Sequence, residues 1–268
     1  MKRFVSVIRL LVLFCHGAVA AAEVGIPAAR QPGTSLDTSV RNEADNAKRL
    51  GAEWLIARQQ PDGSWGSTKA NTVLTPIVWL ALKGMDDAVD AVARDRAVVW
   101  LDAQPVEENV PVDALLWRLL AITHALPDSS ERQTRIQAII HAAQPSVPDL
   151  SAYGDWLWRE AVYPSQRTPA RSSPNNEAQR QLALIAPDYP LDTQNTETFW
   201  YFARLINRYA KGVWMRGTEA LDWRNDFAQA LINAQRKDPS GGGYWNAKTD
   251  DTKIRATAFA LLALGEID

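Results

Sequence analysis

The sequence predicts an all-α protein built from repeated pairs of helices, and three observations support this prediction. Apolar residues recur at spacings of three and four along most of the chain, which is the period of a buried helix face. The alternation of apolar and polar residues that is typical of strands is scarce. Four apolar segments also align with one another without gaps, over 75–82, 115–122, 198–205 and 257–264.

The composition narrows the class of protein. The chain has 268 residues, of which 46% are hydrophobic and 22% are charged, with a formal net charge of -2. These values are ordinary for one large or two small globular domains, and they argue against a basic nucleic-acid-binding protein. The chain contains 11 tryptophans, far more than the roughly 3–5 expected of an average composition.

Residues 1–22 have the pattern of a secretory signal peptide. An apolar run over 10–14 follows basic residues, and Ala18-Val19-Ala20 has the form of a signal-peptidase site. Cys15 lies inside this segment, so the mature chain lacks the residue that disulfides and cysteine-ligated zinc require. We expect an exported protein, periplasmic or secreted, with no membrane span in the mature chain, since no apolar run reaches about 18 residues.

After this segment the sequence predicts a linker over 23–42 and one helical domain over 43–268. Thr75 and Pro76 have the pattern of an N-cap followed by proline at the first helical position. The proline-rich stretch 144–175 predicts a long irregular insertion, and long loops are often functional. The helices are expected over 43–60, 73–84, 87–103, 111–126, 130–143, 176–186, 194–210, 218–236 and 253–265, with a short one near 152–162.

A second repeated element precedes two of the aligned segments. Leu55 is followed four residues later by Gln59, and Leu231 is followed four residues later by Gln235. A glycine and a tryptophan come next in both copies, as Gly63 and Trp65 in the first and as Gly243 and Trp245 in the second. A weaker copy is formed by Trp100, Leu101 and Gln104. The repeating unit is therefore an outer helix, a glutamine, a Gly-aromatic turn and an inner helix.

The stretch 51–65 resembles the QW motif of triterpene cyclases, and 226–264 resembles a second, degenerate copy. This resemblance implies an α/α toroid of four to five helical hairpins, the fold of squalene-hopene cyclases, protein prenyltransferase β subunits and complement thioester domains. In such a motif we expect the glutamine amide to bond the exposed backbone at a helix end, and the tryptophan ring to cover that amide. The six residues expected to form structural clasps are Gln59, Gly63, Trp65, Gln235, Gly243 and Trp245.

The same resemblance raises the question of catalysis. Triterpene cyclases start their reaction with a D-x-D-D-T motif, and here Lys248 replaces the first aspartate while Asp250, Asp251 and Thr252 match. Protonating an alkene requires a carboxylic acid, whereas a neighbouring ammonium favours the carboxylate. The sequence therefore favours a helix cap at Asp250 or Asp251, and a cyclase-like enzyme that uses them as acids remains the alternative.

A carbohydrate-active enzyme is a further alternative, because such enzymes place two carboxylates across an aromatic-lined cleft. Glu160 with Asp155 is the loop pair that fits, and Glu197 is a third candidate. The aromatic residues near these carboxylates are Trp156, Trp158, Tyr163, Trp200 and Tyr201.

These observations together favour a non-catalytic binding or scaffold module with an apolar central cavity. Its partner is expected to be an apolar or isoprenoid small molecule, or another protein. No cofactor and no metal site are expected, because the mature chain has no cysteine and two histidines. The aromatic residues expected to line the cavity are Trp79, Trp117, Trp200 and Phe259.

Overall fold

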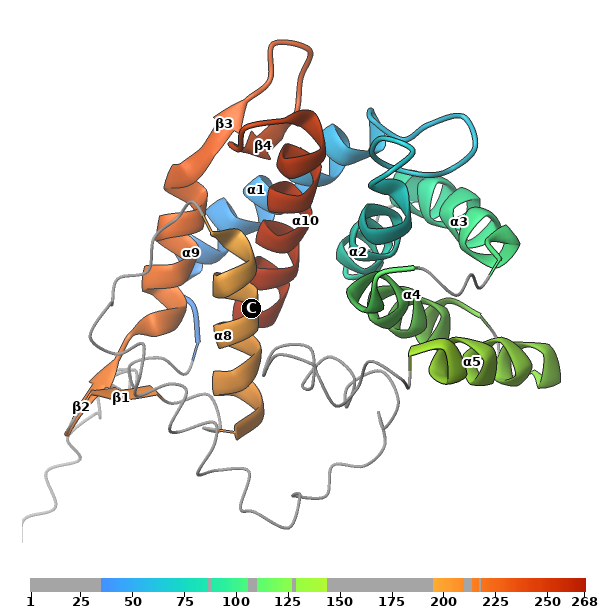
Figure 1. Ribbon diagram of the computed structural model, residues 1–268. Coiled ribbons are helices and arrows are strands. Elements are labelled where there is room, and N and C mark those ends of the chain that lie inside the picture. Colours follow the sequence, from blue (N-terminus) through green and yellow to red (C-terminus); the bar gives the residue numbers. More distant parts are fainter. Residues whose placement is uncertain are drawn as a thin grey trace, which may run out of the picture. The chain divides into compact units, whose positions relative to one another are not determined.

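The computed structural model describes residues 35–85, 88–105, 110–126, 129–143, 195–209, 214–216 and 218–268, and these hold eight helices and four short strands (Figure 1). All of them belong to one unit, Pro32–Asp268. The predicted signal peptide 1–22, most of the predicted insertion 144–175 and the predicted helices near 152–162 and over 176–186 lie outside the described residues. Within the described residues, the prediction of a mostly helical protein is confirmed.

The described helices follow one another in the order predicted by the periodicity of apolar residues. The helices are α1 (Thr38–Ile56), α2 (Asn71–Lys83), α3 (Ala88–Ala103), α4 (Val112–Ala125), α5 (Ser130–Ala143), α8 (Thr196–Tyr209), α9 (Trp223–Ala234) and α10 (Asp250–Ile267). The strands form two antiparallel hairpins, β1 (Trp214–Arg216) with β2 (Glu219–Leu221), and β3 (Gln235–Lys237) with β4 (Gly243–Trp245).

Three predicted boundaries were wrong. Helix α1 begins at Thr38, inside the predicted linker 23–42. Helix α2 begins at Asn71, so Thr75 is not an N-cap and Pro76 lies inside the helix. The range 218–236 holds β2, α9 and β3 rather than one helix, because three-residue strands are too short to show an alternating pattern.

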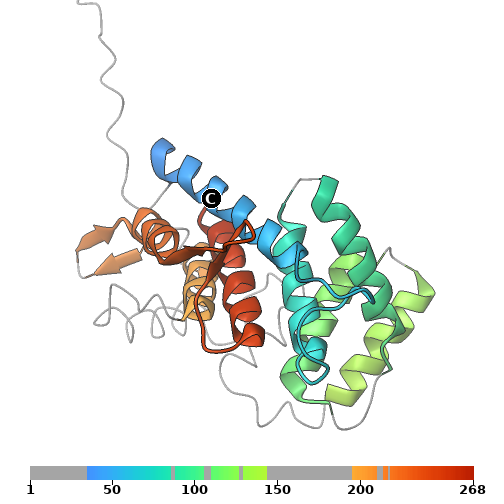
Figure 2. The ribbon, with the colours of Figure 1, turned by 90° about the horizontal axis from the view of Figure 1, so that it is seen from above.

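The helices lie in two rows. The inner row runs α8, α10, α2, α4, where each helix packs against the next (Figures 1 and 2). The outer row contains α9, α1, α3 and α5: α1 packs on α9 and α10, α3 on α2 and α4, and α5 on α4. Each outer helix is thus held mainly by neighbouring repeats. The C-terminal helices α9 and α10 lie beside the N-terminal helix α1, although about 180 residues separate them.

The burial of side chains explains why these helices take the inner row. Helices α2, α4 and α10 bury nearly every residue over 74–79, 114–122 and 256–261. A helix that is apolar all round must be covered on all sides. Helix α1 instead buries one stripe that includes Ala47, Trp54 and Leu55. None of the described helices has the length and apolar character that crossing a membrane requires.

Candidate functional site

The first clasp, Gln59, Gly63 and Trp65, joins the end of α1 to the middle of α3. Trp65 Nε1 donates to the buried Leu55 carbonyl in the last turn of α1 at 2.7 Å, in addition to the bond that this carbonyl accepts from Arg58 N. Gln59 Nε2 donates to the Gly63 carbonyl at 2.9 Å and to the Ala93 carbonyl of α3 at 2.8 Å. The tryptophan, rather than the glutamine, therefore bonds the helix end, and the glutamine reaches a neighbouring repeat.

The second clasp, Gln235, Gly243 and Trp245, repeats this geometry across a longer turn. Trp245 Nε1 donates to the Leu231 carbonyl at 2.8 Å, near the end of α9. Gln235 Nε2 donates to the Ala47 carbonyl of α1 at 2.8 Å. The hairpin β3–β4 pairs Gln235 with Trp245 and accommodates the four additional residues of this turn.

The backbone of each clasp tryptophan is also held by an inner helix. Trp65 N donates to Thr75 Oγ1 at 3.0 Å, and Trp245 N donates to Thr257 Oγ1 at 3.2 Å. Both threonines are completely buried and open aligned segments of the sequence. Each clasp therefore joins an outer helix, a turn and an inner helix.

An aspartate in each turn makes a second contact with the neighbouring outer helix. Asp238 accepts hydrogen bonds from Ser240, from Trp54 Nε1 at 3.0 Å and from Arg58 at 2.9 Å. These bonds, those from Ser240 first, hold the pKa of Asp238 well below its ordinary value. The contact of Asp238 with the neighbouring helix was not predicted from the sequence.

Asp62 takes the corresponding place in the first turn. It accepts from Ser64 N at 2.9 Å and Ser64 Oγ at 2.8 Å, and the nearby Trp100 indole of α3 also lowers its pKa. The backbone bond from Ser64 is the main reason why the pKa of Asp62 is lowered. The signal was present in the sequence, since Asp-x-Ser occurs in both turns, at 62–64 and at 238–240.

The two contact zones are therefore copies of one another. The α9–α1 seam is the zone in which Gln235, Asp238 and Tyr244 contact Ala47, Trp54 and Arg58. The α1–α3 seam is the zone in which Gln59, Asp62 and Gly63 contact Ala93, Arg96 and Trp100. In both, the glutamine bonds an alanine carbonyl, and the aspartate lies near a tryptophan seven residues after that alanine. Two tryptophans of the unusual total are thus seam residues.

The weaker copy of the motif at Gln104 does not form a clasp. Gln104 Nε2 donates to the Trp100 carbonyl of its own helix at 3.2 Å. Arg58 makes the same bond to the Trp54 carbonyl at 3.3 Å, so Gln104 corresponds to Arg58 rather than to Gln59.

Glycine is required in both turns where the chain approaches the next outer helix. Gly63 has φ +94°, and a Cβ there would lie 2.4 Å from the Arg96 carbonyl oxygen. In the second turn this role falls to Gly242, with φ +77° and a Cβ that would lie 3.0 Å from the Leu50 carbonyl. Gly243, the predicted residue, instead leaves room for the Gln235 side chain, which would lie 2.7 Å from an added Cβ.

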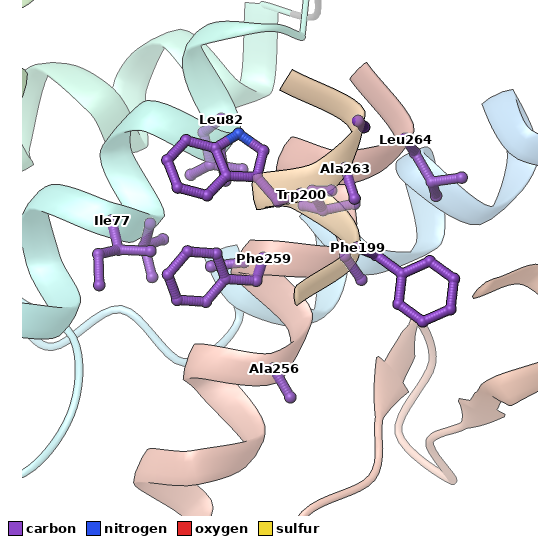
Figure 3. Close-up of a cluster of buried hydrophobic side chains, with 14 of the residues drawn as sticks. Ile77, Leu82, Phe199, Trp200, Ala256, Phe259, Ala263 and Leu264 are labelled. Carbon is purple, nitrogen blue, oxygen red and sulfur yellow. The ribbon is translucent and has the colours of Figure 1, made fainter. Parts of the chain in front are cut away.

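Three of the four predicted cavity residues meet in one place, which we call the aromatic cluster: Trp117, Trp200 and Phe259. Their ring centroids are 5.3 Å (Trp117–Trp200), 5.5 Å (Trp117–Phe259) and 5.6 Å (Trp200–Phe259) apart. All three are at most 2% exposed. Figure 3 shows Trp200 and Phe259 on the side of α8 and α10 that faces Ile77 of α2.

The members of this cluster share one position in the aligned segments. Ile77, Trp117, Trp200 and Phe259 are each the third residue of their segment. Trp79, the fifth residue of its own segment, is also buried, but the Lys83 ammonium lies 5.9 Å from its ring centroid. The structure thus brings three of the four predicted residues together and places Trp79 apart from them.

The predicted acids Asp250 and Asp251 lie in the first turn of α10. The N-cap is Thr249, which forms a capping box with Thr252, so the expectation that an aspartate caps the helix was wrong. Asp250 is 88% exposed and pairs with Lys253 at 3.2 Å. Asp251 accepts from Ser67 N at 2.8 Å and from Ser67 Oγ at 2.6 Å. Asp251 therefore fastens the turn before α2 to the start of α10.

The carbohydrate alternative depends on residues that are only partly described. Asp155, Glu160 and their aromatic neighbours lie outside the described residues. Glu197 forms an ion pair with Arg255, with nitrogen–oxygen distances of 2.9, 3.1 and 3.2 Å. One helical turn further along α8 and α10, the next pair across the interface is Trp200 with Phe259. Within the part of the chain that the structure describes, no group of three potential metal ligands occurs.

Comparison with known proteins gave no match: no family model, no curated protein and no solved structure is similar to this chain.

Proposed function

We propose that this chain is an exported, non-catalytic binding module of the α/α-toroid type, and that its inner helices hold a predominantly apolar small molecule at the aromatic cluster. The observation that carries the proposal is the convergence of Trp117, Trp200 and Phe259, from three inner helices, on one buried point. Aromatic rings provide large apolar contact areas, and ligand sites are lined mainly by such side chains.

The arrangement of the repeats supports a toroid. In a closed ring of repeats, the last repeat must lie beside the first. Here α10 packs against α2 and α9 packs against α1. The α9–α1 seam, which joins the two ends of the sequence, uses the same glutamine and aspartate contacts as the α1–α3 seam between consecutive repeats.

The surroundings of the carboxylates support a binding role over catalysis. Asp250 is exposed to water beside an ammonium, and Asp251 accepts two hydrogen bonds from Ser67. An acid that protonates an alkene must reach its substrate, whereas Asp250 faces water and both oxygens of Asp251 are engaged by Ser67. The Arg255 guanidinium occupies the oxygens of Glu197 in the same way.

Native mass spectrometry of protein recovered from an exporting host tests this proposal. We expect loss of about the first 22 residues and a discrete additional mass that disappears on denaturation. A single apo mass that stays unchanged after apolar compounds are added would contradict the binding role. An uncleaved N-terminus would contradict export by a signal peptide without affecting the binding role.

A further inference from the structure

One buried polar group in the aromatic cluster makes no hydrogen bond to any described residue. The Trp117 side chain is 1% exposed, and its Nε1 has no hydrogen-bond partner in the part of the chain that the structure describes. Buried donors are nearly always paired, because an unpaired one loses its bond to water without replacement. Trp117 Nε1–H therefore needs an explanation.

Three other described tryptophans, each in a clasp or a seam, donate to acceptors that the fold supplies. Trp65 and Trp245 donate to helix-end carbonyls at 2.7 and 2.8 Å. Trp54 donates to Asp238 at 3.0 Å. Trp117 differs from these three in its location, since its ring contacts those of Trp200 and Phe259 in the aromatic cluster rather than lying in a seam or clasp.

We propose that the molecule bound at the aromatic cluster carries a neutral hydrogen-bond acceptor, such as a carbonyl oxygen, that receives the Trp117 Nε1–H bond. This inference rests on the proposed binding function and adds the polarity of the ligand to it. The acceptor is neutral because the guanidinium groups over two rings of the cluster already have carboxylate partners. Arg255, over Phe259, pairs with Glu197, and Arg204, over Trp200, pairs with Glu266. Burying an unpaired anion among these rings would be unfavourable.

The test compares tetralin with 1-tetralone, which have the same two-ring skeleton and differ by one carbonyl group. Dissociation constants for both are measured by calorimetry on wild type, Trp117→Phe and Trp79→Phe. Trp79 is a matched control: it is buried, its Nε1 is also without a partner among the described residues, and it lies on the neighbouring inner helix outside the cluster. Thermal unfolding of each variant reports separately on folding.

We expect Trp117→Phe to lower the preference for tetralone over tetralin by about 2- to 10-fold, the range for one net hydrogen bond. Trp79→Phe should leave this preference unchanged. In wild type, the carbonyl stretch of bound tetralone should shift to lower frequency, and the shift should disappear in Trp117→Phe. This infrared measurement on wild type holds even if a variant fails to fold.

Two outcomes would overturn the inference, and they are distinguishable. If both compounds bind wild type with an unshifted carbonyl stretch, or the tetralone preference survives Trp117→Phe, the acceptor is wrong and the binding function stands. If neither compound binds wild type and no ligand mass is found, the proposed function itself fails.

Discussion

Trp54 shows how single residues hold neighbouring repeats together. Its ring lies between the Arg58 guanidinium, 3.8 Å from the ring centroid, and the Tyr244 ring, stacked at 5.4 Å. Its Nε1 donates to Asp238, so one side chain combines stacking, a cation–π contact and a charge-assisted hydrogen bond. The contacts of single residues in the two seams predict how specific substitutions change the stability of the protein.

Replacing Gln59 with alanine should destabilise the protein by about 1–3 kcal/mol, because two hydrogen bonds to backbone carbonyls are lost at a part-buried site. Gln104→Ala is the matched control, since the Gln104 side chain bonds the Trp100 carbonyl of its own helix, and it should cost less than about 0.5 kcal/mol. Urea unfolding measures both. Equal effects would mean that the clasp glutamine does not join the repeats.

Replacing Gly63 with alanine should cost about 2–4 kcal/mol, since the residue has a positive φ and the added Cβ would meet the backbone of α3. Gly265, inside α10, has open space around the same position. Gly265→Ala should therefore stabilise the protein by up to about 1 kcal/mol through helix propensity. Thermal denaturation separates the two, and a neutral Gly63→Ala would contradict the close approach of turn and helix.

The elements that carry the seams are the turns after α1 and α9. Each turn places a glutamine and an aspartate against the outer helix of the next repeat. Inner helices receive the same turns through Thr75 and Thr257. These shared contacts explain why turns of different length produce the same interface. The aspartates among them predict that stability depends on pH.

The lowered pKa of Asp238 predicts that acid weakens the α9–α1 seam. A group whose pKa is lower in the folded state stabilises the fold fully above its unfolded pKa, about 3.9 for aspartate. That stabilisation is lost as the pH falls below this value. Asp238→Asn should therefore lower Tm at pH 7 and make Tm less dependent on pH in the acid range.

Asp62→Asn provides an independent repeat of this experiment, since the pKa of Asp62 is also lowered. Melting curves between pH 7 and pH 2 measure both variants. If Asp238→Asn leaves Tm at pH 7 and its acid dependence unchanged, the aspartate does not hold the seam.

For the whole molecule, the seams connect the two ends of the described chain into one set of contacts. Helix α1 lies between the two seams and contacts both the C-terminal helices and α3. No described repeat is therefore packed independently of the others, which predicts how the molecule unfolds and binds.

Unfolding should be a single cooperative transition. Gln235→Ala and Gln59→Ala act on different seams, and each should shift the same transition to lower temperature without revealing a second one. Calorimetry with circular dichroism as a second probe checks this. A separate early transition in Gln235→Ala would show that α9 and α10 unfold on their own.

The proposed ligand should associate with the aromatic cluster much more slowly than at the diffusion-limited rate. The rings of the aromatic cluster contact one another and are at most 2% exposed, so they must separate before a molecule can enter. Stopped-flow measurements with 1-tetralone should give an association rate below the usual 10⁵–10⁷ M⁻¹s⁻¹ range. A rate at or above that range would mean that the site lies on the surface instead.

The sequence by itself determined the helices and the repeat, because burial of one face imposes a period of three and four that needs no knowledge of distant residues. It also predicted the two clasps and the three aromatic residues that meet in the cluster, since these predictions rest on local patterns, although Gly242 rather than Gly243 makes the close approach in the second turn. Only the tertiary structure decided what these residues contact. Gln59 bonds a helix carbonyl 34 residues away, and Trp54 bonds Asp238 across 184 residues. No local pattern specifies such a partner, because long-range contacts depend on how whole helices pack.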